Sequence, residues 1–134
     1  MYSKLLIKEA LHNIEQILQE LQEWTSHITC GDDFALSHDG MVLLNAVCMK
    51  FIVLGEEVKS IDKRTNKMLL PLYPSVDWQA IMKLRDKTVH HYFDIDADKI
   101  AEILLNDIPY VLPVIRQMQS DLCNNPDETE CSVI

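Results

Sequence analysis

One short stretch of this sequence gathers side chains that can act on a phosphodiester. Within residues 84–93, Arg85, His90 and Tyr92 follow one another at fixed spacing. Arginine is always cationic, and its planar guanidinium binds phosphate oxygens through parallel N–H groups. Histidine titrates near neutral pH, so it can take up or release a proton during a reaction. An arginine and a histidine near one helix end can together support phosphodiester chemistry without a metal ion.

The spacing of Arg85 and His90 restricts how they can act together. Five residues correspond to about 140° around an ideal α-helix, so the two side chains do not share a face of a straight helix. They can meet at one phosphate if the helix unwinds near His90, or if a two-fold dimer supplies a second copy of the motif. Asp86 lies four residues before His90 and could orient it. Alternatively, Arg85 is structural and pairs with Glu56 or Glu57 of a neighbouring helix.

Periodic apolar residues predict long helices before this stretch. The chain has only 3 Gly and 5 Pro, so turns are few and a fold of many short strands is disfavoured. Apolar residues recur at helical spacing through residues 4–24, and again from near Ser37 or Asp39 to about Ile61. The second of these helices is apolar on nearly all sides, which predicts that it is the most buried. Gly55 interrupts it and predicts the close approach of another helix.

Two further helices are predicted, one of which carries the motif. Residues 25–39 are polar and are expected to form a loop. The motif helix should begin after an N-cap at Asp77 and run to about His91, and the next should follow an N-cap at Asp96. Two prolines inside that last pattern should kink or split it near Asn106. The sum is an all-α bundle of four to five helices with up-down packing.

Composition limits the other features of the chain. Residues 1–120 are expected to form one helical domain, and 121–134 an acidic, disordered tail. Cysteines and histidines lack metal-ligand spacing, so we predict no metal site and no cofactor. Residues 131–134 fit a prenylation pattern, but the acidic residues before them favour a plain tail. With no apolar run long enough to cross a membrane and no signal-peptide pattern, a cytoplasmic protein without membrane contact is expected.

Further landmarks surround the motif in a fixed order over about residues 40–118. They are Leu54-Gly55-Glu56-Glu57-Val58-Lys59, Tyr73-Pro74-Ser75-Val76-Asp77-Trp78-Gln79-Ala80-Ile81, Asp94-Ile95-Asp96 and Asp107-Ile108-Pro109. Together with Arg85-x4-His90-x-Tyr92, this series resembles the HepT-like family of HEPN-domain ribonuclease toxins. An Arg-x4-His pair alone would be weak evidence, but the ordered landmarks make the resemblance specific.

The resemblance implies a HEPN-like bundle that pairs into a two-fold homodimer and acts as a metal-independent endoribonuclease. On that basis, His90 removes the proton of the ribose 2′-hydroxyl or protonates the leaving 5′-oxygen. Arg85 stabilises charge on the phosphorane-like transition state, and the product carries a 2′,3′-cyclic phosphate. Asp86, His91 and Glu56 are expected to support this pair.

The resemblance also implies two partners, an RNA substrate and a small MNT-type nucleotidyltransferase antitoxin of a type VII-like toxin–antitoxin pair. The antitoxin would transfer AMP to Tyr92, and the added phosphate would repel RNA and block the cleft. The chain departs from the family pattern at His91, where glycine is frequent, and at Asp86, where asparagine is frequent. A negative Asp86 would weaken anion binding. The alternative is therefore a non-catalytic HEPN dimer that binds nucleotide or its nucleotidyltransferase partner.

The distribution of charge leaves room for a local RNA site. The chain has 12 Lys and Arg against 21 Asp and Glu, and its net charge of -9 argues against a broad basic coat for nucleic acid. Residues 59–87, however, contain seven basic and three acidic side chains, a local charge of +4. Salt-sensitive RNA binding is expected in one cleft. Its predicted basic residues are Lys59, Lys63, Arg64, Lys83 and Lys87.

Overall fold

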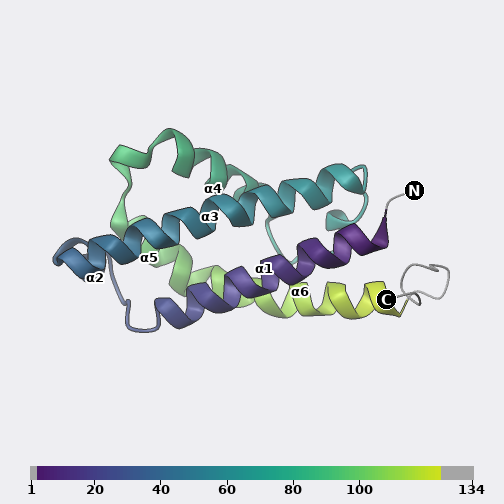
Figure 1. Cartoon of the computed structure of the whole chain (residues 1–134), viewed down its shortest axis with the longest axis horizontal. Helices are drawn as coiled ribbons and strands as arrows, with labels where there is room; N and C mark the ends of the chain where they lie inside the picture. The colour runs from purple at the N-terminus through teal and green to yellow at the C-terminus, as the bar shows by residue number, and fades with distance from the viewer. Residues whose placement is uncertain (1–2, 125–134) are drawn as a thin grey trace.

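Helices form all the regular structure in residues 3–124, the part of the chain that the computed structural model describes (Figure 1). No β-strand occurs within that part, so the predicted all-α class is confirmed. Five long helices are joined by one short helix and two 3-10 turns. They are α1 (Lys4–Trp24), α2 (Asp32–Ala35), α3 (His38–Arg64), η1 (Leu70–Leu72), α4 (Trp78–His90), η2 (Tyr92–Asp94), α5 (Ala97–Asn106) and α6 (Ile108–Cys123).

The core forms where α1 packs between α3 and α6. Apolar side chains of α1 recur every three or four residues, and Leu11, Ile14 and Leu18 on that stripe are fully buried. The stripe contacts α3 and α6, whose ribbons flank α1 in Figure 1. On α3, Phe51 and Leu54 are fully buried as well. The helices α1, α3 and α4 run in alternating directions, which confirms the expected up-down packing.

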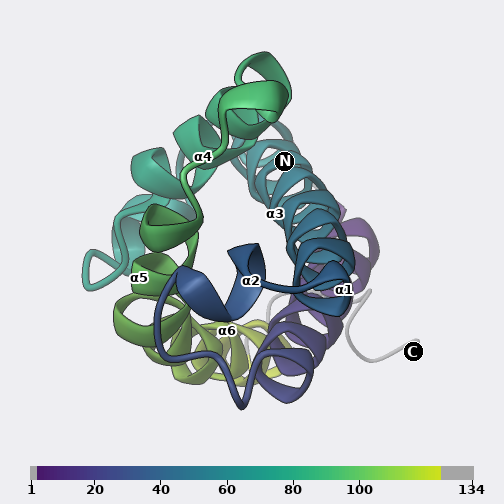
Figure 2. The same cartoon turned by 90° about the vertical axis from the view of Figure 1, so that its left-hand side faces the viewer.

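The prediction of a loop over residues 25–39 was wrong in its second half, where α2 forms. Figure 2 shows α2 lying across one end of the bundle, where it contacts α3 and α5. Its Phe34 is fully buried and closes that end of the core. Asp33 holds the turn before it, because its Oδ2 accepts a hydrogen bond from Thr29 N at 2.7 Å. A four-residue helix with one buried side chain is too short to show a hydrophobic period.

The predicted division of the last helix is confirmed, because α5 ends at Asn106 and α6 begins at Ile108. Pro109 lies in the first turn of α6, where a missing N–H costs no helical hydrogen bond. Placed within one continuous helix, the same proline would remove an internal hydrogen bond and clash with the preceding turn. Pro113 remains inside α6. The bundle therefore has five long helices, the upper of the predicted numbers.

Two boundaries lie further along the chain than predicted. The N-cap of α3 is Ser37, whose Oγ accepts from Gly40 N at 2.9 Å, and the helix continues to Arg64, past the expected end at Ile61. Likewise, α6 continues to Cys123, so the first residues assigned to the tail are helical. The rest of that predicted tail, and the prenylation pattern within it, lie outside the described residues. Among the helices described, none is both long and apolar enough to span a membrane.

Candidate active site

The motif helix α4 is fixed at its start by two local hydrogen bonds. Asp77 is its N-cap, as predicted, and its Oδ1 accepts from Ala80 N at 3.0 Å. Trp78 is buried and donates from its indole Nε1 to Tyr73 O at 2.9 Å, which ties the helix to the preceding turn. From there α4 packs along α3. The chain remains α-helical as far as His90, so Arg85 and His90 lie on one regular helix.

At Gly55, α3 and α4 approach each other closely beside the motif. A Cβ atom added to Gly55 would lie 2.2 Å from Arg85 Cβ and 3.0 Å from its Cγ, so any larger residue here would force Arg85 or the helices to shift. The predicted close approach is therefore confirmed, and the neighbouring group is the stem of the motif arginine. Because Glu56 follows Gly55 directly, the same contact brings its carboxylate beside the guanidinium.

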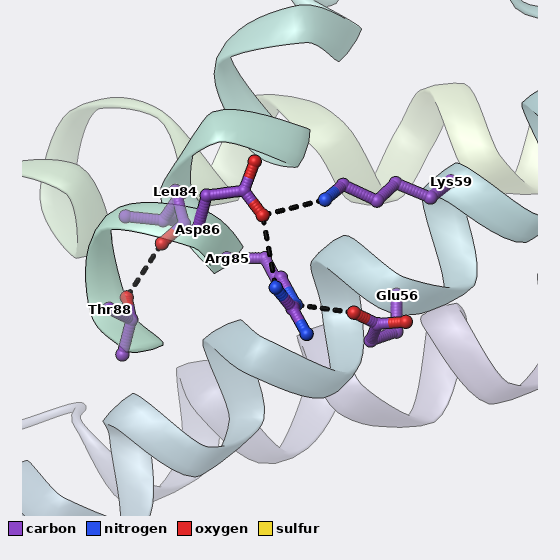
Figure 3. A network of polar contacts seen from close by, with 6 residues as sticks. All are labelled: Glu56, Lys59, Leu84, Arg85, Asp86 and Thr88. Atoms are coloured by element: carbon purple, nitrogen blue, oxygen red, sulfur yellow. Dashed lines mark hydrogen bonds and ion pairs between the residues drawn. The ribbon is translucent and has the colours of Figure 1, made fainter. Parts of the chain in front are cut away.

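Arg85 belongs to a network of four charges that links α3 to α4 (Figure 3). Its Nε forms an ion pair with Glu56 Oε1, without the alignment of a hydrogen bond, and its Nη1 donates to Asp86 Oδ1 at 3.1 Å. Lys59 Nζ donates to the same Asp86 oxygen at 2.6 Å. This hydrogen bond from Lys59, and then that from Arg85, holds the pKa of the Asp86 carboxyl below its usual range. The ion pair between Arg85 and Glu56, which was expected if Arg85 has a structural role, is therefore present.

Arg85 and His90 do not meet within one chain. Because α4 does not unwind before His90, the two side chains point in directions about 140° apart. Arg85 contacts α3, whereas His90 is exposed in the last turn of α4. The recorded partners of Asp86 are Lys59 and Arg85, so the idea that Asp86 orients His90 does not hold in the single chain. Of the two ways of joining Arg85 to His90, unwinding of the helix between them is therefore not seen in the single chain.

Tyr92 lies just beyond α4, and its side chain contacts α3 near the beginning of that helix. Its hydroxyl donates to Asn45 Oδ1, while Asn45 Nδ2 donates to Met41 O at 2.8 Å. The Tyr92 ring also meets Phe93 edge-on, with 5.5 Å between ring centroids, and Phe93 is 97% exposed. Sequence reasoning missed Asn45, although a polar residue within a nearly apolar helix was a usable signal. The partner 47 residues away could not be identified from spacing.

The predicted basic residues divide over three places rather than one cleft. Lys59 belongs to the charge network, and Lys63 and Arg64 are exposed at the end of α3. Lys83 and Lys87 lie on another face of α4. There they line a groove of about 890 Å³ that runs between α4, α5 and the start of α6 and that also takes in His91.

The groove differs from the charge network in character. Its floor is apolar, with Ile81, Ile100 and Val111, while Asp94 and Glu102 add negative charge to its walls. Within one chain, the basic residues predicted for a single RNA cleft are therefore divided between the charge network, the end of α3 and this groove. Over residues 3–124, no three His, Cys, Asp or Glu side chains gather closely enough to hold a metal ion.

Comparison with known proteins places this arrangement in a family. The family model described as "Ribonuclease HepT-like" matches residues 7–118. The chain belongs to the HepT-like family. The match covers α1 to α6 and includes Arg85, His90 and Tyr92, so the resemblance inferred from the motif and its landmarks is confirmed.

Relatives in the HepT-like family cover most of this chain and of their own lengths. MJ0127 of Methanocaldococcus jannaschii, which is assigned as an RNase, is 29% identical over 117 residues, covering 87% of this chain and 89% of its own. A protein of Thermococcus cleftensis assigned as ribonuclease HepT is 28% identical over 102 residues, covering 76% and 86%. TTE0752 of Caldanaerobacter subterraneus, also assigned as an RNase, is 28% identical over 105 residues, covering 78% and 89%. No solved structure gives a significant match.

Proposed function

We propose that this HepT-like protein is a metal-independent endoribonuclease toxin whose cleft is completed by a second copy of the chain. The observation that carries the proposal is the regular helix between Arg85 and His90, which directs the two side chains apart. In a two-fold dimer, Arg85 of one copy can face His90 of the other. Family membership and the RNase assignments of the relatives support RNA as the substrate.

Cleavage at such a cleft needs only the RNA and these side chains. The ribose 2′-oxygen attacks the adjacent phosphorus, a bond to that oxygen forms, and the bond to the 5′-oxygen breaks. The proton of the 2′-hydroxyl ends on the leaving 5′-oxygen, and His90 acts at one of these two transfers. The Arg85 guanidinium stabilises the charge that gathers on the non-bridging oxygens. The products are a 2′,3′-cyclic phosphate and a 5′-hydroxyl.

An exposed apolar surface beside the motif supports the homodimer. Met49, Val53, Val89 and Phe93 are all exposed on α3, α4 and the turn that follows. Met49 and Val53 are four residues apart in the chain, as are Val89 and Phe93, and exposed large apolar side chains that lie together are typical of protein contacts. Because the surface includes residues on both sides of His90, a two-fold contact through it would bring the two motifs together.

Cleavage of RNA in the presence of EDTA tests the proposal directly. We expect the wild type to cleave and His90→Ala to lose about 10²- to 10⁴-fold in rate, the usual size of acid–base catalysis. His12→Ala is the control, because His12 is an exposed histidine on α1 and lies outside the motif helix. Equal losses in both variants would contradict the role given to His90. A wild type that binds nucleotide without cleaving RNA would favour the non-catalytic alternative.

The second part of the proposal is that a nucleotidyltransferase antitoxin inactivates the protein by transferring AMP from ATP to the Tyr92 oxygen, with release of pyrophosphate and of the hydroxyl proton. Tyr92 lies two residues beyond His90 in the chain and is about half exposed. Its hydroxyl donates a hydrogen bond to Asn45. Incubation with the partner and ATP should add AMP to the intact mass of the wild type. Tyr92→Phe should lose the addition, while Tyr110→Phe, which removes the hydroxyl of another exposed tyrosine, should keep it. Equal addition to Tyr92→Phe would contradict the assignment.

A further inference from the structure

The cationic groups that face α3 at the motif are already occupied by carboxylates of the same chain. Arg85 contacts Glu56 and Asp86, and Lys59 contacts Asp86, so two positive charges are matched by two negative ones (Figure 3). A guanidinium binds phosphate most strongly when two N–H groups on one edge point at it together. Glu56 lies against Nε, which bears a single hydrogen, so the edge that uses Nε is not free for a phosphate.

The arginine itself cannot leave this arrangement easily. Its Cβ and Cγ lie so close to Gly55 that an added Cβ there would overlap them, which fixes the stem of Arg85 against α3. Only the guanidinium end retains freedom, and its side chain is 30% exposed. A phosphate that binds the Nε edge of Arg85 must therefore come to the place where Glu56 lies.

The two carboxylates differ in how firmly they are held. Asp86 accepts hydrogen bonds from both Lys59 and Arg85, and these two contacts restrain it. Glu56 has an ion pair to Arg85 as its recorded contact, and its side chain is 51% exposed. It can rotate into water at little cost, since exposed ion pairs contribute weakly. Glu56 is thus the replaceable group and Asp86 the permanent one.

We propose that Glu56 is an internal competitor for RNA, which occupies the Nε edge of Arg85 until a phosphate displaces it and thereby sets the affinity for RNA. This inference rests on the proposed function, because it assumes that Arg85 receives the RNA phosphate. Its consequence is selectivity. An anion must displace Glu56 to bind the Nε edge of Arg85, so a lone phosphate binds there poorly, whereas an RNA strand has further contacts that offset the cost.

The test measures RNA binding in a His90→Ala background, where cleavage does not interfere, by fluorescence anisotropy of a labelled single strand. We expect Glu56→Gln to tighten binding about two- to fivefold, the effect of releasing an exposed ion pair. Glu57→Gln is the matched control, because it removes the same charge from the next residue, which does not pair with Arg85 among the described contacts. It should change affinity clearly less.

A second comparison separates competition from a general charge effect. In an Arg85→Ala background, Glu56→Gln should no longer tighten binding, because the group for which Glu56 competes is gone. The inference is overturned if both glutamine variants tighten binding equally, if Glu56→Gln weakens it, or if its effect persists without Arg85. In those outcomes the wild type still cleaves RNA and the proposed function stands. Absence of RNA binding in every variant, together with no cleavage by the wild type, would overturn both.

Discussion

At the residue scale, Gly55 shows how one missing methyl group positions a catalytic candidate. Gly55→Ala would place a Cβ 2.2 Å from Arg85 Cβ, so α3 and α4 must separate or Arg85 must shift. We expect a loss of about 1–3 kcal/mol in the free energy of unfolding, as for other overpacked contacts, partly offset by the better helix propensity of alanine. The rate of RNA cleavage should fall by more than the loss in free energy of unfolding explains, because Arg85 is displaced.

The control for Gly55→Ala is Ser60→Ala, which lies on the same helix and whose recorded hydrogen bond is to Arg64. Chemical denaturation and RNA cleavage measured on both variants give the comparison. If Gly55→Ala were as stable and as active as Ser60→Ala, the contact with Arg85 would not be needed to hold the guanidinium in place.

Asp86 gives a prediction about pH at the same scale. Its folded-state pKa is lowered, first by Lys59 and then by Arg85, so it stabilises the fold at pH values above its unfolded pKa of about 3.9. That contribution is lost as pH falls through the lower folded value. The difference in free energy of unfolding between wild type and Asp86→Asn should therefore shrink on acidification below about pH 4.

Urea unfolding at a series of pH values measures this difference. In a Lys59→Met background the first cause of the lowered pKa is absent, so the pH dependence of the difference should become weaker. A difference that stays constant down to pH 2 would show that the pairs of Asp86 do not contribute through its ionisation.

At the scale of the elements, the long helices could be predicted from the periodicity of their apolar residues, whereas the short helix α2 could not. The helix over residues 4–24 and the caps at Ser37, Asp77 and Asp96 follow from local chemistry, which acts within one turn. By contrast, α2 depends on the burial of a single phenylalanine at the end of the bundle, which is a tertiary effect.

The candidate site divides in the same way. The motif, its helix and the contact at Gly55 were all predicted from sequence. The positions of Lys83 and Lys87 were not, because neighbours in the sequence window point to different faces of α4. Asp86 contacts Lys59 and Tyr92 contacts Asn45, both on α3, across distances in sequence that no spacing rule reaches.

The burial of α3 can be tested through Cys48. Burial raises the pKa of its thiol to about 11, and the side chain is only 2% exposed, whereas Cys30 is exposed. In the folded protein at pH 8, iodoacetamide should alkylate Cys30 much faster than Cys48, because the thiolate is the reacting form. Peptide mass mapping reports both sites, and in denaturant the rates should become similar. Rapid labelling of Cys48 without denaturant would show that α3 is more accessible than its packing implies.

At the scale of the whole molecule, the acidic average and the local chemistry are compatible. A net charge of -9 disfavours indiscriminate binding to RNA, and the internal pairing of Arg85 and Lys59 lowers the local attraction further. What remains is a site that gains little from any single phosphate. Such a site depends on geometry, and under the proposed function a second copy of the chain brings His90 to the Arg85 of the first.

Complementation between two inactive variants tests that geometry. Arg85→Ala and His90→Ala should each be inactive alone. If one cleft uses Arg85 from one copy and His90 from the other, a mixed dimer retains one cleft with both residues intact. After denaturation and refolding together in equal amounts, half of the dimers are mixed and each has one of two clefts, so about a quarter of the wild-type activity should return.

The reference for this complementation is a mixture of Arg85→Ala with an Arg85→Ala/His90→Ala double variant, in which every cleft lacks Arg85. It should stay inactive at the same protein concentration. If the mixture of single variants also stays inactive while size-exclusion chromatography shows dimers, the two residues do not combine across the two-fold axis. The straight helix between them would then require a different explanation, since it keeps them apart within each chain.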